Sequence, residues 1–226
     1  MNVLICAAHP DDEVLGCGGT IARLAKEGND VYIAILGEGI TSRSAHREDA
    51  DPSLIRQLHD RSRKVAKLLG AKDLWMYSLP DNRFDTIPLL DAVKIIEDLI
   101  KLVQPRMIYT QHGGDLNIDH VVAFRAALTA SRPMVGCPVK AVYSFPVASS
   151  SEWAFHQFSP AVQPNIFVDI SSTLDLKIEA MQLYESETRP FPHPRSPEAL
   201  RAAAQYWGSV VGFSAAEAFH CIREQQ

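Results

Sequence analysis

The most chemically informative stretch of the sequence runs from Ala8 to Glu13 and reads Ala-His-Pro-Asp-Asp-Glu. Histidine and aspartate are both zinc ligands, and a catalytic zinc ion usually takes three protein ligands and leaves one position open for water. His9 and Asp12 could supply two of those ligands, which would leave Asp11 to accept a proton from the attacking water. A solvated acidic turn before a helix has the same composition, because aspartate favours helix N-termini. Composition alone does not distinguish a zinc site from such a turn.

A second polar stretch, from Gln111 to His120, contains two histidines, two aspartates and an asparagine. Its last residue, His120, falls in the first turn of a predicted helix, where a lone histidine is more often structural than catalytic. His120 would nevertheless complete a three-ligand set if it reached His9 and Asp12. Asp119 could then hold the outer nitrogen of a ligand histidine, as carboxylates do in many zinc sites.

Three glycines, Gly16, Gly18 and Gly19, follow the first stretch. Their spacing matches neither the dinucleotide fingerprint nor the phosphate-binding loop of nucleotide hydrolases, and no lysine stands where a phosphate would need it. We therefore expect these glycines to let a helix pack closely against the sheet.

Short apolar runs alternate with helical patterns along the chain, which predicts an α/β fold with a Rossmann-like, mostly parallel sheet and helices on both faces. The expected strands are Val3–Ala7, Val31–Leu36, Leu74–Tyr77, Met107–Thr110, Lys140–Phe145 and Asn165–Ile170. The expected helices are Val14–Lys26, Leu54–Leu69, Leu89–Val103, Asp119–Ala130, Ser172–Tyr184, Pro197–Val211 and Ala215–Glu224. Because no linker rich in glycine or serine divides residues 1–226, we expect a single domain.

Parallel strands present their carboxyl ends at one edge of a sheet, and ligands bind there. Polar residues follow four of the predicted strands: the stretch beginning at His9, then Gly37-Glu38, then Asp81 and Asn82, and then Gln111-His112. Four separate segments should therefore place polar side chains at the same edge of the sheet.

The net charge of −5 over 226 residues gives no electrostatic footprint for nucleic acid. The four cysteines are widely spaced and form no Cys-x-x-Cys pair, so they indicate neither a zinc ribbon nor a disulfide framework. The first apolar run is broken by His9 and is too short for a signal peptide or a membrane span. These features predict a cytoplasmic protein that neither binds nucleic acid nor spans a membrane.

The first stretch, the glycines after it and the later Asp119-His120 resemble the LmbE-like, or PIG-L-like, N-deacetylase family. Leu69-Gly70, Pro80-Asp81-Asn82 and Ala216–Phe219 extend the resemblance over most of the chain. The resemblance implies a Rossmann-like fold, a zinc cofactor held by His9, Asp12 and His120, and Asp11 as general base. It further implies hydrolysis of an N-acyl group, with N-acetyl as the first expectation, from an amino sugar or its conjugate, and a possible homo-oligomer.

One position departs from the family pattern. Many relatives carry a second histidine three residues before the zinc-binding one, and this chain has Asn117 there. An asparagine amide can donate a hydrogen bond to an oxyanion but cannot deliver a proton at neutral pH. Asn117 could keep that electrostatic role, or His112 could fold back over the following glycines and supply the missing imidazole. Asn117 also suits a plain helix N-cap.

Loops should form the sugar pocket. Arg47 and His193, together with Asp81 and Asn82, are our candidates for substrate binding, although each also suits a solvated loop or a capped turn. Two other functions stand as alternatives: a nucleotide-binding Rossmann-like enzyme, against which the glycine spacing argues, and a non-catalytic sugar-binding protein, which would have no use for Asp11 as a base.

Overall fold

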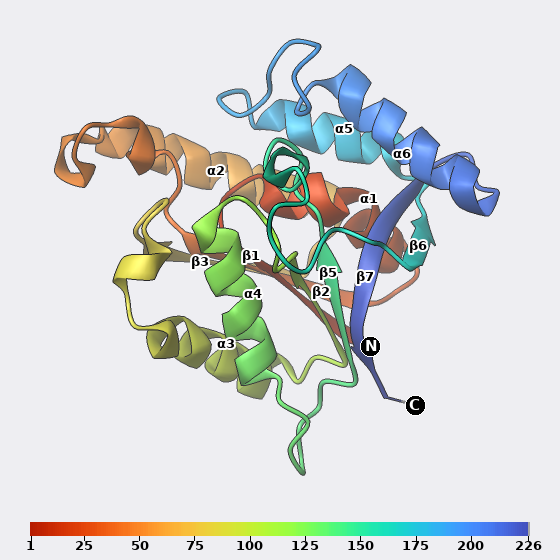
Figure 1. Ribbon diagram of the computed structural model, residues 1–226, viewed down its shortest axis with the longest axis horizontal. Coiled ribbons are helices and arrows are strands. Elements are labelled where there is room, and N and C mark those ends of the chain that lie inside the picture. The colour runs from red at the N-terminus through yellow and green to blue at the C-terminus, as the bar shows by residue number, and fades with distance from the viewer. Residues whose placement is uncertain (226) are drawn as a thin grey trace.

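The computed structural model describes residues 1–225, which form one seven-stranded sheet flanked by helices (Figure 1). The strands are β1 (Asn2–Ala7), β2 (Asp30–Gly37), β3 (Asp73–Leu79), β4 (Met107–Gln111), β5 (Ala141–Phe145), β6 (Ile166–Asp169) and β7 (Ala216–Glu224). The helices are α1 (Asp12–Lys26), α2 (Pro52–Leu69), α3 (Leu89–Val103), α4 (Ile118–Ala130), α5 (Leu174–Leu183) and α6 (Pro197–Val211). The α/β class and most predicted elements are confirmed, with boundaries shifted by a few residues.

The strand order is β3-β2-β1-β4-β5-β7-β6. The first five strands are parallel, and β7 runs antiparallel to both of its neighbours. The chain moves outward in one direction from β1 to β3 and then returns to β4 on the other side of β1. This reversal creates a crevice at the carboxyl ends of β1 and β4, where open sheets of this kind bind ligands.

The predicted helix Ala215–Glu224 is wrong, because these residues form β7. The segment begins with alanines and a glutamate, which favour helix in isolation. Its apolar run is also too short for periodicity to distinguish a strand from a buried helix. In the folded chain it pairs with β5 on one side and β6 on the other, and this pairing outweighs the local preference.

Helices cover both faces of the sheet, as predicted (Figure 1). Alternate residues of β1 point to opposite faces. Val3 and Ile5 pack in the core beneath α1, α2, α5 and α6. Leu4 and Cys6 pack in the core beneath α3 and α4. The two cores hold the carboxyl ends of the parallel strands at one edge of the sheet.

The glycines of α1 pack closely, as expected from the sequence. A Cβ atom on Gly16 would lie 2.1 Å from the Phe145 ring, and one on Gly19 would lie 2.8 Å from Ile170. Real Cβ atoms do not approach neighbours so closely, so a side chain at either position would force α1 away from the sheet.

None of the helices within residues 1–225 has both the length and the apolar composition that a membrane span requires.

Candidate metal centre

The first polar stretch lies in the crevice between β1 and β4. His9 follows β1 directly, Asp12 begins α1, and His120 lies in the first turn of α4. One donor atom from each lies within 4.8 Å of the other two, so the fold brings together all three predicted zinc ligands.

The spacing of these atoms suits a small tetrahedral ion. Asp12 Oδ2 lies 3.3 Å from His9 Nδ1 and 3.3 Å from His120 Nε2. In a tetrahedral zinc site with bonds of about 2.0–2.1 Å, neighbouring ligand atoms lie about 3.3–3.4 Å apart. The same Asp12 oxygen accepts hydrogen bonds from the His9 backbone N–H, at 2.8 Å, and from Gln111 Nε2, at 3.1 Å. These bonds fix the carboxylate between the two imidazoles.

Asp119 orients the His9 ring. Its Oδ2 lies 2.8 Å from His9 Nε2, the nitrogen that faces away from Asp12. The carboxylate is fully buried and also accepts the backbone N–H groups of Asn82, at 2.6 Å, and Phe84, at 2.8 Å. His9 therefore presents Nδ1 to the ligand cluster, in the carboxylate–histidine arrangement common in zinc proteins.

Asp115 stands in the same relation to His120. Its Oδ1 lies 3.0 Å from His120 Nδ1, which leaves Nε2 facing Asp12. The hydroxyl groups of Ser150 and Ser151 each donate to one oxygen of the Asp115 carboxylate. Both histidines of the cluster thus have a buried carboxylate on the outer nitrogen.

The electrostatics of the cluster favour a cation. Burial lowers the pKa of His120, but the Asp12 charge and the hydrogen bond to Asp115 outweigh it and raise that pKa to about 9. Burial also lowers the pKa of His9, yet its bonds to Asp119 and Asp12 raise it well above the ordinary value. Carboxylates that draw protons onto buried imidazoles would equally favour a divalent metal in place of those protons.

Asp11 lies beside the cluster in an unusual backbone conformation. Its φ angle is 102°, in a region that non-glycine residues seldom adopt, and its side chain is only 2% exposed. Strained conformations of this kind concentrate at functional sites. Its Oδ2 lies 2.7 Å from Arg195 Nη1. Burial raises the pKa of Asp11 well above its usual range, although the Arg195 charge opposes that effect.

A cavity of about 230 Å³ opens over the cluster. His9, Asp11 and His120 line it, and so do Asp81 and Asn82, which the sequence predicts near the substrate. Asn117 lines it too. Its Oδ1 accepts the Asp119 backbone N–H at 2.9 Å, so the N-cap role is confirmed. Its Nδ2 donates to Asn82 Oδ1 at 3.0 Å.

Three predicted residues lie outside this cavity. Arg47 forms two hydrogen bonds with Glu38, at 2.7 and 2.8 Å. The ring of His193 packs against Trp153 at a centroid distance of 5.6 Å. His112 does not fold back toward the cluster, because its Nε2 donates to the Pro160 carbonyl at 2.7 Å. The expectation that these three side chains reach the site is therefore not met.

Three linked charged residues, Glu187, Arg43 and Arg195, lie on the cavity wall instead. Glu187 binds both Arg43, at 2.6 Å, and Arg195, at 3.3 Å. Arg43 and Arg195 come from the same two loops as Arg47 and His193, where the sequence predicts the sugar pocket, and both line the cavity. Nothing in the sequence pairs Arg195 with Asp11, 184 residues earlier. The role of Asp115 had a weak signal, since it lies five residues before His120 in a polar turn.

The chain is similar to one known protein family and to proteins that are named as deacetylases. Residues 4–131 match the model of the PIG-L family, described as GlcNAc-PI de-N-acetylase. A protein of Escherichia coli (strain K12) named uncharacterized deacetylase YaiS is 30% identical over 136 residues, which cover 58% of this chain and 68% of that protein. Diacetylchitobiose deacetylase of Thermococcus kodakarensis is 25% identical over 235 residues, covering 98% of this chain and 83% of that protein.

Among solved structures, GalB of Pseudomonas putida KT2440, a 4-carboxy-2-hydroxymuconate hydratase, has a similar fold. Its TM-score is 0.78 at 21% sequence identity, and the match covers 100% of this chain and 97% of that chain. At this identity the likeness extends to the fold alone. The family match spans more than half of the chain and contains all three residues of the ligand cluster. The chain therefore belongs to the PIG-L, or LmbE-like, N-deacetylase family.

Proposed function

We propose that this protein is a zinc-dependent N-deacetylase that hydrolyses the N-acyl group, N-acetyl in the first instance, of an amino sugar or amino-sugar conjugate. The observation that carries the proposal is the convergence of His9, Asp12 and His120 beside the Asp11 carboxylate, under one polar cavity. A binding protein would have no need for a strained, buried carboxylate next to a metal site.

The residues present fit zinc. Two imidazole nitrogens and one carboxylate oxygen make a common catalytic donor set, and their spacing suits tetrahedral coordination. Asp119 and Asp115 hold the outer nitrogens, which favours the neutral, metal-binding tautomer of each ring. Zinc bound here would polarise the acyl carbonyl and lower the pKa of the attacking water.

Asp11 is the proposed general base. It would take a proton from the attacking water and deliver it to the amine that leaves the acyl group. Asp12 cannot take this role, because both imidazoles and two hydrogen-bond donors already surround its Oδ2. Arg195, 2.7 Å from Asp11, holds the base in position, and its charge opposes the rise in the pKa of Asp11 that burial causes.

Asn117 is the better candidate for contacting the oxyanion. Its amide lines the cavity, and the N-cap bond to the Asp119 backbone N–H leaves the amide hydrogens directed away from α4. One of them binds Asn82, and an asparagine N–H can donate to developing negative charge. His112, bound to the Pro160 carbonyl, takes no part in this proposal.

The sugar is proposed from the relatives and from the cavity wall. The name of the Thermococcus relative refers to diacetylchitobiose, an N-acetylated amino sugar. Asp81 and Asn82 supply a carboxylate and an amide to the same cavity, which suit sugar hydroxyl groups. Because a protein of the same fold is a hydratase, the fold alone does not decide the reaction.

The test is an acetate-release assay of the zinc-loaded protein over N-acetyl amino sugars in free, nucleotide-linked and lipid-linked form. Wild-type protein should release acetate from at least one of them, and Asp11→Asn should not, although it should bind zinc equally well. Absence of acetate release from every amide by zinc-loaded wild-type protein would overturn the proposal.

A further inference from the structure

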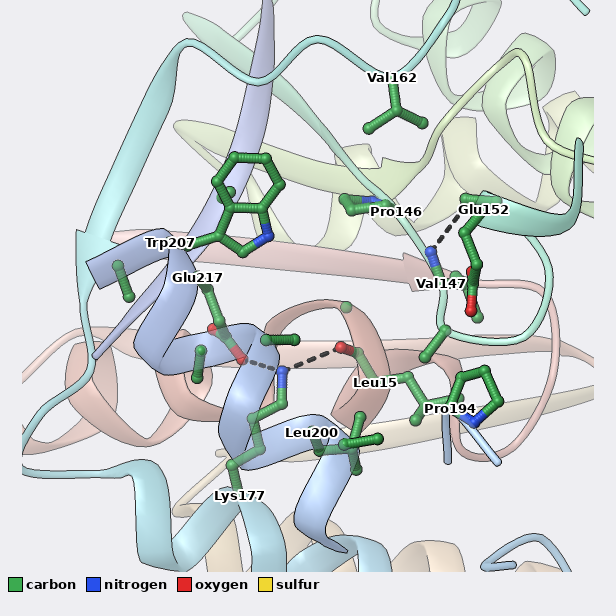
Figure 2. A pocket seen from close by; sticks show the side chains of 18 of the residues that line it. Leu15, Pro146, Val147, Glu152, Val162, Lys177, Pro194, Leu200, Trp207 and Glu217 are labelled. Atoms are coloured by element: carbon green, nitrogen blue, oxygen red, sulfur yellow. Dashed lines mark hydrogen bonds and ion pairs between the residues drawn. The ribbon is translucent and has the colours of Figure 1, made fainter. Parts of the chain in front are cut away.

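A second and larger cavity lies behind the first, outside the proposed catalytic site. Its volume is about 480 Å³, and it shares no lining residue with the cavity over His9. It is lined by α6, β7, the first half of α1, Lys177 of α5 and the segment that follows β5 (Figure 2). The two cavities meet back to back along that segment, because Ser149 and Ser150 face the first while Ala148 and Ser151 face the second.

The walls of this cavity are mostly apolar. Helix α6 contributes Ala199, Leu200, Ala203, Ala204 and Trp207. This spacing places the five side chains on one helical face. Figure 2 shows Pro146, Val162 and Pro194 on the remaining sides. Ligand cavities of proteins commonly hold about 300–1,000 Å³ and combine apolar walls with a few polar groups.

One buried ion pair, Lys177–Glu217, lies at the floor of the cavity, with Nζ and Oε1 2.5 Å apart. It has a structural role, because α1 is broken at Cys17, whose φ is −147°. Glu217 accepts the N–H groups of Gly19, at 3.0 Å, and Thr20, at 2.7 Å, beyond the break. Lys177 donates to the Leu15 carbonyl before the break, at 2.9 Å. The pair thus satisfies backbone groups that the broken helix leaves open.

The structural role of the Lys177–Glu217 pair leaves one hydrogen-bond donor of Lys177 unused. An ammonium group has three N–H donors, and the structure of residues 1–225 engages only two of those on Lys177 (Figure 2). The indole N–H of Trp207 has no acceptor among the residues drawn around the cavity. Both side chains line the cavity, so a ligand that carries a hydrogen-bond acceptor would find donors on its wall.

The charges around the cavity select against an anion. Glu217 and Glu152 are acidic, Lys177 is the one Lys or Arg of the lining, and its charge is already matched by Glu217. His156 also lines the cavity, but it is exposed. A carboxylate on the ligand would bring into a largely apolar space a negative charge that no unpaired Lys or Arg of the lining balances, which costs more than burying a neutral oxygen.

We propose that this cavity is a binding site, separate from the catalytic one, for a neutral and mostly apolar molecule that carries one oxygen acceptor, such as an aliphatic alcohol or ketone. The apolar body would lie against the α6 face and the prolines, and the oxygen would accept from Lys177 or Trp207. The site does not depend on the proposed deacetylase activity, because none of its residues belongs to the metal cluster or its supporting carboxylates.

Titration calorimetry with 1-hexanol and 1-octanol tests the site directly, on protein without added metal and without an activity assay. Burying each methylene contributes about 0.8 kcal/mol, so affinity should rise roughly fourfold per methylene, or about fifteenfold from hexanol to octanol. Octanoate should bind more weakly than octanol. Failure to detect saturable octanol binding up to its solubility limit, or tighter binding of octanoate, would overturn the proposal.

A matched pair of variants tests whether octanol binds in this cavity. Ala203 and Ala202 are adjacent exposed residues of α6, and only Ala203 lines the cavity. Ala203→Phe should fill the space and weaken octanol binding at least tenfold, whereas Ala202→Phe should leave it unchanged. Circular dichroism verifies that both variants are folded. Equal affinity for octanol in the two variants would place its binding elsewhere and refute the assignment.

Discussion

Replacing Asp119 with asparagine tests whether His9 is a metal ligand, without touching His9 itself. The Asp119 carboxylate is fully buried and faces three N–H donors: His9 Nε2 and the backbone amides of Asn82 and Phe84. An asparagine of the same shape offers one oxygen and one NH₂ group. Either orientation of that amide therefore sets its NH₂ group against at least one of these donors.

The magnitude follows from the contacts that are lost. Removing the partner that orients a ligand histidine typically lowers metal affinity by roughly 10- to 100-fold. A buried N–H left without an acceptor costs about 1–3 kcal/mol, so the metal-free variant should also unfold at a lower denaturant concentration. We expect both effects in Asp119→Asn.

Zinc affinity is measured by competition with a chromophoric chelator, and stability by denaturant unfolding of the metal-free protein. Asp81→Asn is the matched control. Asp81 is also buried near His9 Nε2, but its Oδ1 lies 3.4 Å away and is not hydrogen-bonded to it. Both variants remove one nearby negative charge and disturb nearby N–H donors, but only Asp119→Asn changes the hydrogen-bond partner of His9 Nε2. Unchanged zinc affinity in Asp119→Asn, or an equal loss in both variants, would refute the assignment of His9.

The other predictions address the remaining parts of the molecule. Asp11→Asn should retain zinc and fold while acetate release falls by roughly a hundredfold or more; near-normal turnover would assign the base elsewhere. His120→Ala should lose most of its zinc in metal analysis, and full zinc content would remove it from the ligand set. Asn117→Ala should lower the unfolding free energy by about 1 kcal/mol through the lost cap and kcat by roughly a hundredfold; an effect on stability alone would leave it as a cap. Glu217→Ala should lower the unfolding free energy by about 3–5 kcal/mol, because it strands the buried Lys177 ammonium; a loss below about 1 kcal/mol in denaturant unfolding would contradict the role of the pair.

Much of the candidate site followed from the sequence because its residues are placed by local rules. The apolar runs that become β1 and β4 are each followed directly by polar residues, and parallel strands end at the same edge of a sheet. His9 and Asp12 are fixed relative to each other by only three residues of chain. The position of His120 follows from the start of α4, after the loop 112–117 that follows β4. Local geometry, together with the shared edge of the parallel strands β1 and β4, thus made the ligand cluster predictable.

Contacts between distant segments were decided only by the tertiary structure. The pairing of Arg195 with Asp11 spans 184 residues, and Arg47 turns to Glu38 although its loop position suited a sugar equally well. A side chain in a loop takes its partner from whichever segment packs against it, and no local pattern encodes that neighbour.

Contacts between distant segments also explain why Ala216–Glu224 forms the strand β7. The sequence determined that Ala216–Glu224 would be ordered and partly apolar, but its first residues favour helix and its length fits either structure. Only the open edges of β5 and β6, formed by residues far away in the chain, make the strand the more stable choice. Glu217 then reaches α1 from that strand. Hydrogen bonding across the assembled sheet, rather than local propensity, decided this part of the fold.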